Sequence, residues 1–254
     1  MSFLSKLKIL QFIIREPRLL FGRTRYIFII SHMRSRSTVL AHILGTNHNI
    51  SGYRELHISY KGRLSLLRMR VILFREFKFS LKSRYLLDKI LHNYTITNKL
   101  INRVKPKVIF LLREPEATLK SILFMGAKLN LEQYEDPVKV LNYYCSRLKQ
   151  MEVYSKSLEK GCFFVESDEF INNSSVTLNR LTEWLQLDVP LSTSYSIFRK
   201  TGKGGAGDPS PVITSGVLKN KESDYSDIII PPEVLERAEA AYKHCKSVLL
   251  SNLN

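Results

Sequence analysis

The sequence predicts a single α/β domain with a central parallel sheet flanked by helices. Three short apolar runs, at residues 26–30 (YIFII), 108–112 (VIFLL) and 162–165 (CFFV), have the length and composition of fully buried strands. Segments with helical periodicity separate them, and strands that alternate with helices form parallel sheets covered on both faces. The chain has 254 residues, 44% of them hydrophobic. Because this is enough for one substantial core, we expect residues 1–254 to form one domain.

The remaining elements continue the same alternation. Helices are predicted at residues 37–44, 115–128, 136–160, 175–187 and 232–250, and shorter strands at 50–53 and 85–87. Gly45 and Gly161 follow two of these helices, as glycine commonly does, and Pro115 begins another. Ligands of parallel sheets bind at the carboxyl ends of the strands. The loops after residues 30 and 112 are therefore the expected positions of a functional site.

The charge balance favours an anionic partner. Basic residues outnumber acidic ones by 39 to 23, a formal net charge of +16. Such an excess suits a nucleotide, a nucleic acid, an acidic glycan or a membrane surface. A nucleic acid is not expected, because the sequence has neither an RNP-like motif nor a zinc finger, and its charges stand at predicted strand ends instead of in one stripe.

The cysteines and the apolar segments indicate a cytoplasmic protein. Cys145, Cys162 and Cys245 are widely separated and odd in number, so we expect free thiols in a reducing compartment and neither a disulfide framework nor a metal site. No apolar stretch approaches the length of a membrane span, and no cleavage pattern follows the N-terminus. An apolar stripe at residues 2–14 is either part of the core or a peripheral membrane anchor.

The loop after the first strand carries groups that suit an anion. Arg34 and Arg36 supply cationic forks, Ser35, Ser37 and Thr38 supply hydroxyls, and the following helix supplies free N–H groups. Together these form a phosphate cradle. The GxxxxGK[ST] pattern is absent, which counts against a nucleotide-dependent kinase. The alternative is that the hydroxyls only cap the helix while the arginines lie in water.

A second strand end strengthens the anion-binding interpretation. Arg113 follows the strand at 108–112, and Ser121 lies eight residues further on, inside the next predicted helix. The loop at 34–38 and this pair resemble the family of sulfotransferases that use PAPS (3′-phosphoadenosine-5′-phosphosulfate). In that family a loop of the type R/K-S-G-[ST]-T binds the 5′-phosphosulfate, and an Arg and a Ser at this spacing hold the 3′-phosphate.

A third segment extends the resemblance to about 175 residues. Residues 198–208 (FRKTGKGGAGD) are similar to the family's C-terminal Arg-Lys-Gly…Gly-Asp loop, which closes over the nucleotide. The resemblance implies a P-loop-like sulfotransferase fold with PAPS as co-substrate and no metal. It also implies a basic segment at 1–25, a nucleotide-binding core at 26–170, and C-terminal helices with a closing loop at 171–254. The enzyme would transfer a sulfuryl group from PAPS to a hydroxyl and release PAP.

The resemblance also implies roles for particular residues. Arg34 aligns with the family residue that stabilises the bridging oxygen, and the loop hydroxyls hold the 5′ end. Arg199, Lys200 and Gly202 fall in the closing loop and are expected to contact the nucleotide. The chain departs from the family at Arg36, which occupies a glycine's place and either contacts the sulfonate or points away. The closing loop is also longer and richer in glycine than the family pattern.

The general base is expected just after the second predicted strand. Glu55 is the first candidate and His57 the second, because the family uses a Glu or a His near this distance from the loop. The alternative is that Glu55 pairs with Arg54 or caps a turn. His92 is a distant third candidate. Asp88 and the adjacent Lys89 are expected to pair structurally at a strand end.

The acceptor is not identified by the sequence. Residues 61–84 hold eight basic residues and one acidic residue among large apolar ones. This pattern favours a helix with its apolar face packed and its basic face in water over a rim that binds an acidic glycan or an amphiphilic lipid. Two other functions are open alternatives: a kinase-like phosphotransferase, and a non-catalytic protein that binds PAP or polyanions. The oligomeric state is left open.

Overall fold

The structure, a computed structural model, describes residue 14 and residues 24–77, 83–158, 161–205, 207–208, 210–220 and 224–252. The basic segment predicted at residues 1–25 and the alternative anchor at 2–14 therefore lie almost entirely outside the described residues. Among the helices within these ranges, none is both long and apolar enough to cross a membrane.

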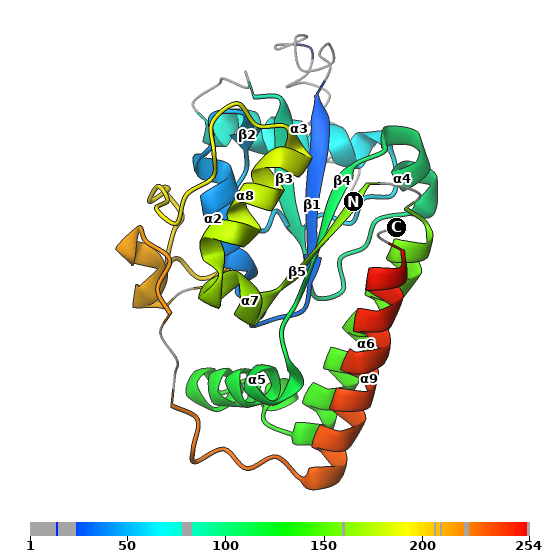
Figure 1. The fold of residues 1–254 in the computed structure, drawn as a ribbon, viewed down its shortest axis with the longest axis vertical. Helices are drawn as coiled ribbons and strands as arrows, with labels where there is room; N and C mark the ends of the chain where they lie inside the picture. Colours follow the sequence, from blue (N-terminus) through cyan, green and yellow to red (C-terminus); the bar gives the residue numbers. More distant parts are fainter. Residues whose placement is uncertain are drawn as a thin grey trace.

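A five-stranded sheet in which every neighbouring pair is parallel forms the centre of the protein (Figure 1). Its strand order is β2-β3-β1-β4-β5. The strands are β1 (Arg25–Ser31), β2 (Ile50–Ser51), β3 (Tyr85–Ile90), β4 (Lys107–Leu112) and β5 (Cys162–Glu166). This confirms the predicted α/β class with a parallel central sheet.

Helices cover both faces of the sheet. The core on one face includes α2 (Ser37–Thr46), α7 (Ser167–Asn172) and α8 (Ser174–Leu185), and the core on the other includes α3 (Arg63–Glu76), α4 (Asn98–Val104), α5 (Pro115–Leu129), α6 (Pro137–Lys156) and α9 (Pro232–Ser251). Two short 3-10 helices, η2 (Glu132–Tyr134) and η3 (Pro211–Ser215), lie in connecting segments. Side chains of β1 alternate between the two cores: Ile27 and Ile29 pack in the first, and Phe28 and Ile30 pack in the second.

Within the basic stretch at 61–84, residues 63–76 form α3, and residues 78–82 lie outside the described residues. Leu66, Met69 and Phe74 of α3 are buried, while Arg63 and Arg75 are exposed. This agrees with the interpretation of a packed helix with a solvated basic face.

Two buried side chains brace the carboxyl end of the sheet. Arg147 of α6 donates to the carbonyl oxygens of Ser31 and Ile90, each over 2.9 Å, and so ties β1 to β3. His32 accepts from the backbone N–H of Arg113 at 3.1 Å through Nε2, which leaves Nδ1–H to donate to the Met33 carbonyl at 2.8 Å. Burial lowers the pKa of His32 to about 3, so this histidine is a neutral brace between β1 and β4.

Candidate active site

The loop between β1 and α2 has an uncommon backbone. Arg34 and Arg36 adopt φ values of 60° and 66°, in the left-handed region that favours glycine. Arg36 thus has a backbone conformation that glycine adopts readily, at the position where the family pattern has a glycine. Its Nη1 donates to the Asp168 carboxylate at 2.6 Å and to the Ser167 carbonyl at 3.2 Å. These contacts fasten the loop to the start of α7 and direct Arg36 toward the carboxyl end of β5.

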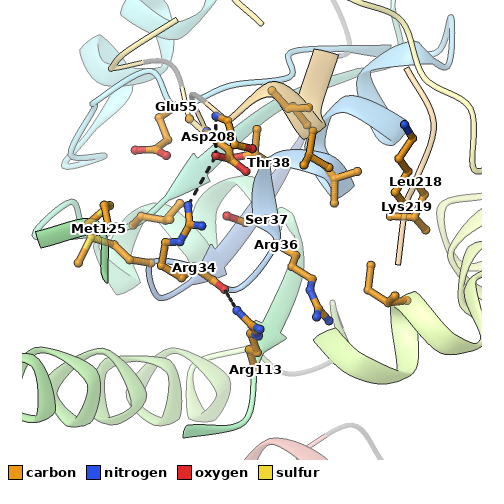
Figure 2. A pocket seen from close by; sticks show the side chains of 18 of the residues that line it. Arg34, Arg36, Ser37, Thr38, Glu55, Arg113, Met125, Asp208, Leu218 and Lys219 are labelled. Carbon is orange, nitrogen blue, oxygen red and sulfur yellow. Dashed lines mark hydrogen bonds and ion pairs between the residues drawn. The ribbon is translucent and has the colours of Figure 1, made fainter. Parts of the chain in front are cut away.

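The two predicted anion loops meet directly. Arg34 Nε donates to Ser121 Oγ at 2.8 Å. Arg113 Nη1 donates to the Arg34 carbonyl at 3.1 Å (Figure 2). Arg113 Nε is buried without a hydrogen-bond partner among the described residues. Burial, reinforced by nearby Arg36, lowers the pKa of Arg113. An anion placed here would supply both the missing partner and the missing negative charge.

The helix that follows the loop offers its N-terminus to a ligand. No side-chain hydrogen bond caps α2, which counts against the interpretation that the serines and Thr38 only cap it. Ser37 and Thr38 line the cavity described below, whereas the Ser35 hydroxyl is buried beside it. Thr38 Oγ1 accepts from Lys89 Nζ at 2.9 Å and from the Asp208 backbone N–H at 3.1 Å. The N-terminal turn of α2 is therefore held by β3 and by the closing loop.

Glu55 lies at the centre of a cluster of titratable groups. Its Oε1 is 3.2 Å from Lys89 Nζ, and its Oε2 is 3.7 Å from His92 Nε2 and 4.0 Å from His57 Nδ1. Burial alone would raise the pKa of Glu55, but Lys89 and the two histidines hold it below its usual value. Arg54 contacts Glu76 instead, with Nη2 2.9 Å from the carboxylate, so the expected alternative pair of Glu55 and Arg54 does not form.

The side chains of Asp88 and Lys89 do not pair as predicted, although the Lys89 backbone N–H donates to Asp88 Oδ1 at 2.7 Å. Both residues lie inside β3, where successive side chains point to opposite faces. The Asp88 carboxylate accepts from the Leu56 backbone N–H at 2.9 Å and from the Tyr60 hydroxyl at 2.5 Å. The side chain of Lys89 is fully buried on the opposite face of β3, where its Nζ lies in the cluster of titratable groups around Glu55.

Several contacts anchor the closing loop, residues 198–208. Phe198 stacks on Tyr53 with ring centroids 4.1 Å apart, and Thr201 Oγ1 lies 2.9 Å from His42 Nε2. His57 Nε2 is 2.7 Å from the Gly205 carbonyl, which makes Nε2 the donor. Further along, Asp208 lies 3.6 Å from Arg34 Nη1.

A cavity of about 280 Å³ joins these parts. Six of the predicted site residues line it: Arg34, Arg36, Ser37, Thr38, Glu55 and Arg113. The cavity lining does not include Ser35, Ser121, His57, Arg199, Lys200 or Gly202, although Ser121 contacts Arg34. Arg199 is exposed, and Gly202 adopts a left-handed φ of 72°.

Several lining residues were not predicted as site residues. Asp208, Lys219 and Tyr225 belong to the C-terminal third of the chain, and Tyr225 lies 2.9 Å from Ser121 through the two hydroxyl oxygens. His92, the distant third candidate for the base, lines the cavity beside Glu55. Over the described ranges, no group of three or more His, Cys, Asp or Glu is placed to hold a metal.

Comparison with known proteins identifies the class of fold. No protein-family model matches the sequence, and neither does any curated protein. Solved structures show that the chain has the sulfotransferase fold. One similar structure is the sulfotransferase domain of the curacin biosynthetic pathway, which matches with a TM-score of 0.56 and 14% identity over 86% of this chain and 98% of that one.

Two further structures show the same similarity. The sulfotransferase domain of the Synechococcus PCC 7002 olefin synthase matches with a TM-score of 0.57 and 14% identity over 87% of this chain and 95% of that one. Mouse sulfotransferase SULT7A1, complexed with PAP, matches with a TM-score of 0.53 and 14% identity over 91% of this chain and 87% of that one. The similarity thus spans most of each chain.

Proposed function

We propose that the protein is an enzyme that transfers a sulfuryl group from PAPS to a hydroxyl of an acceptor. One contact carries the proposal: Arg34 Nε donates to Ser121 Oγ at 2.8 Å, which joins two anion loops that are 87 residues apart. PAPS carries phosphate at its 5′ and 3′ positions, so its site needs two anion-binding loops around one cavity. The fold similarity to sulfotransferases, one of them complexed with PAP, supports the proposal.

The cavity residues can be assigned to the two ends of the nucleotide. The N–H groups at the start of α2, with the hydroxyls of Ser37 and Thr38, hold the 5′-phosphosulfate. Arg113 and Ser121 hold the 3′-phosphate through charge-assisted hydrogen bonds. Arg36 has Nη1 on Asp168, and its other guanidinium nitrogens are assigned to the nucleotide. Ser121 lies outside the cavity lining but is included because it contacts Arg34 and Tyr225, which line the cavity. Contacts from Ser35, Arg199, Lys200 and Gly202, which also lie outside the lining, stay predictions from the sequence.

The transfer needs positioned cations and a base. The acceptor oxygen attacks the sulfur atom in line, the bond from sulfur to the 5′-phosphate oxygen breaks, and PAP leaves with that electron pair. Arg34, between the two loops, stabilises the charge that develops on the bridging oxygen. The acceptor proton passes to a side chain of the protein.

His92 is the proposed general base, and Glu55 is the residue proposed to orient it. Both line the cavity, whereas His57 is bound to the closing loop. The Glu55 carboxylate is paired with Lys89, which makes it a weak base. Burial lowers the pKa of His92, partly offset by Glu55, so the imidazole is neutral near pH 7 and can take a proton. We therefore assign the proton transfer to His92 and the orientation of its ring to Glu55.

The experiment combines nucleotide binding with turnover. Calorimetry should show PAP binding to the intact protein, and PAPS labelled in its sulfuryl group should pass the label to a hydroxyl acceptor. No PAP binding would reject the proposal. Phosphate transfer from ATP would favour the kinase alternative. Binding of generic polyanions that is unaffected by Arg113→Ala, together with no turnover, would favour the non-catalytic alternative.

A further inference from the structure

The cavity has two halves that differ in charge. Figure 2 shows Glu55 and Met125 on one side of Arg34, and Arg36, Leu218 and Lys219 on the other. The second half is the nucleotide half, because Arg36 and the nearby Arg113 belong to the anion loops. The first half is the side from which an acceptor would approach Arg34.

The acceptor half consists of Met33, Glu55, Leu91, His92 and Met125, all of which line the cavity. His92 faces Glu55 at 3.7 Å, and its ring lies 6.4 Å from that of Tyr143. Tyr143 in turn accepts from the Met33 backbone N–H through its hydroxyl at 2.9 Å. The half therefore holds the close pair of Glu55 and His92, and the apolar side chains of Met33, Leu91 and Met125 line the same cavity.

The charges of the acceptor half are already balanced. The only carboxylate among its five residues is Glu55, and its partner Lys89 lies 3.2 Å away with its side chain fully buried. Lys89 is also bound to Thr38, so it offers no free charge to an acceptor. The cations in the described cavity lining are Arg34, Arg36, Arg113 and Lys219, none of which belongs to this half. An acidic group of the acceptor that lies beside Glu55, away from Arg34, would thus have no unpaired cation to bind.

We propose that the acceptor is an uncharged hydroxyl compound with an apolar body, such as a neutral aryl or alkyl alcohol, and not an acidic glycan or a carboxylate-bearing metabolite. The proposal rests on the proposed function, since it assumes that the nucleotide occupies the other half. Apolar surface on Met33, Leu91 and Met125 binds the body of the acceptor by the hydrophobic effect. An ammonium group gains little here, because Lys89 already neutralises Glu55. The basic excess of the cavity then serves the nucleotide alone.

A pair of acceptors that differ by one charge tests this inference. The intact protein is given PAPS with 2-naphthol or with 6-hydroxy-2-naphthoate, and kcat/KM is measured for each, alongside desulfated heparin as an acidic glycan. We expect 2-naphthol to be preferred on the order of tenfold, since a carboxylate would lose hydration in a half whose one buried cation, Lys89, is already paired with Glu55. An equal or greater rate with the carboxylate or the glycan overturns the inference. The inference is also overturned if the protein binds PAP but neither sulfates nor binds 2-naphthol and 1-octanol.

A matched pair of variants locates the effect in the acceptor half. Met125→Lys adds a cation to this half and should reduce the preference for 2-naphthol several-fold. Leu129→Lys adds the same charge one turn further along α5, at a side chain that is 52% exposed and outside the cavity lining, and should leave the preference unchanged. Equal effects of the two variants overturn the inference. If the proposed function itself were wrong, either PAP would not bind, or PAP would bind and no acceptor of any class would be sulfated; calorimetry and the three acceptors together separate both results from a wrong acceptor class.

Discussion

Arg34 Nε and Ser121 Oγ lie 2.8 Å apart, although 87 residues separate them in the sequence. The contact exists because β1 and β4 are neighbours in a parallel sheet, so that the loop after each strand opens at the same edge. Arg113 adds a second link by donating to the Arg34 carbonyl at 3.1 Å. Because these contacts join the loops without a ligand, the two loops are preorganised for a ligand that bridges them.

Replacement of Arg113 should weaken PAP binding. Arg113→Ala removes a charge-assisted contact to the 3′-phosphate, and we expect the Kd to rise about 10- to 100-fold. Arg113→Lys should recover only part of the affinity, because an ammonium group cannot make the forked contact. Arg103→Ala, at an exposed position on α4, is the control and should leave the calorimetric Kd unchanged. Equal Kd values for the Arg113→Ala and wild-type proteins would contradict the assignment.

Substitutions of Arg36 should separate its backbone effect from its side-chain contact. Both Arg36→Gly and Arg36→Ala remove the ion pair with Asp168, but only glycine relaxes the strain of a φ near 66°. We expect the free energy of unfolding to be higher for Arg36→Gly than for Arg36→Ala by about 1 kcal/mol. Urea denaturation measures the difference. If the alanine variant were as stable as the glycine variant, the left-handed conformation would not persist in solution.

The rate of sulfuryl transfer should fall in acid because of His92. Its pKa lies below the usual 6.5, so the imidazole is unprotonated near pH 7 and takes a proton as the pH falls below that value. We expect kcat/KM to be level at neutral pH and to decrease on the acid side. His92→Asn should lower kcat by about 10²- to 10⁴-fold and remove this acid limb.

Variants of the neighbouring residues identify the base independently. Glu55→Gln should move the acid limb to lower pH, because the Glu55 carboxylate raises the pKa of His92. His57→Gln should keep both the limb and most of the rate, since His57 is bound to Gly205. A loss with His57→Gln as large as that with His92→Asn would assign the base to His57 instead.

Stability should decrease as the pH falls from 7 to 5. Burial lowers the pKa of His32 to about 3 and that of His42 to about 4, while both titrate near 6.5 in the unfolded chain. At these two residues the unfolded state therefore binds more protons in this window, and each histidine removes about 2 kcal/mol between pH 7 and pH 5. Asp88 acts in the opposite direction, because burial raises the pKa of its carboxyl to about 7 and the folded state takes up that proton, which offsets about one histidine. Thermal unfolding at both pH values measures the remaining loss. His42→Gln should remove most of it, and an unchanged loss would contradict the role of His42.

The sequence predicts most of the fold, and part of the site, for identifiable reasons. The continuous apolar runs of β1 and β4 are buried on both faces, so their pattern is unmistakable. The strand predicted at 85–87 is too short, because Asp88 and Lys89 interrupt the apolar run of β3 although both are buried. Because of that error, Lys89 is not among the predicted site residues.

Contacts made by loops were harder to predict. The place of Arg36 against Asp168 depends on which strand lies beside β4, and the sequence pattern does not define strand order. The approach of Asp208 to Arg34 depends on the path of a glycine-rich loop, in which backbone freedom is large. The sequence gives His92 only as a third candidate for the base, because the contact of His92 with Glu55 depends on packing between segments far apart in the chain.

A methyl group at Gly207 should open the contact between the closing loop and the first anion loop. Gly207 has a φ of 130°, and a Cβ there would lie 2.9 Å from Thr38 Oγ1 and 3.3 Å from Lys89 Nζ. Gly207→Ala must therefore move the loop off Thr38, where the Asp208 N–H now donates to Oγ1. We expect weaker PAP binding and a lower kcat/KM, each by about tenfold, since about 1.4 kcal/mol is lost when one such contact is broken.

A second glycine in the same loop provides the control for this prediction. A Cβ at Gly204 would meet no atom within 4 Å, so Gly204→Ala adds the same methyl group without a clash. It should leave PAP affinity and turnover at the wild-type level. Calorimetry with PAP and initial rates with PAPS compare the two variants directly. If both weakened binding equally, the effect would come from reduced backbone freedom in the loop; if neither did, the packing of Gly207 on Thr38 would be irrelevant to nucleotide binding. Only a selective loss in Gly207→Ala supports a closing loop that acts through Thr38.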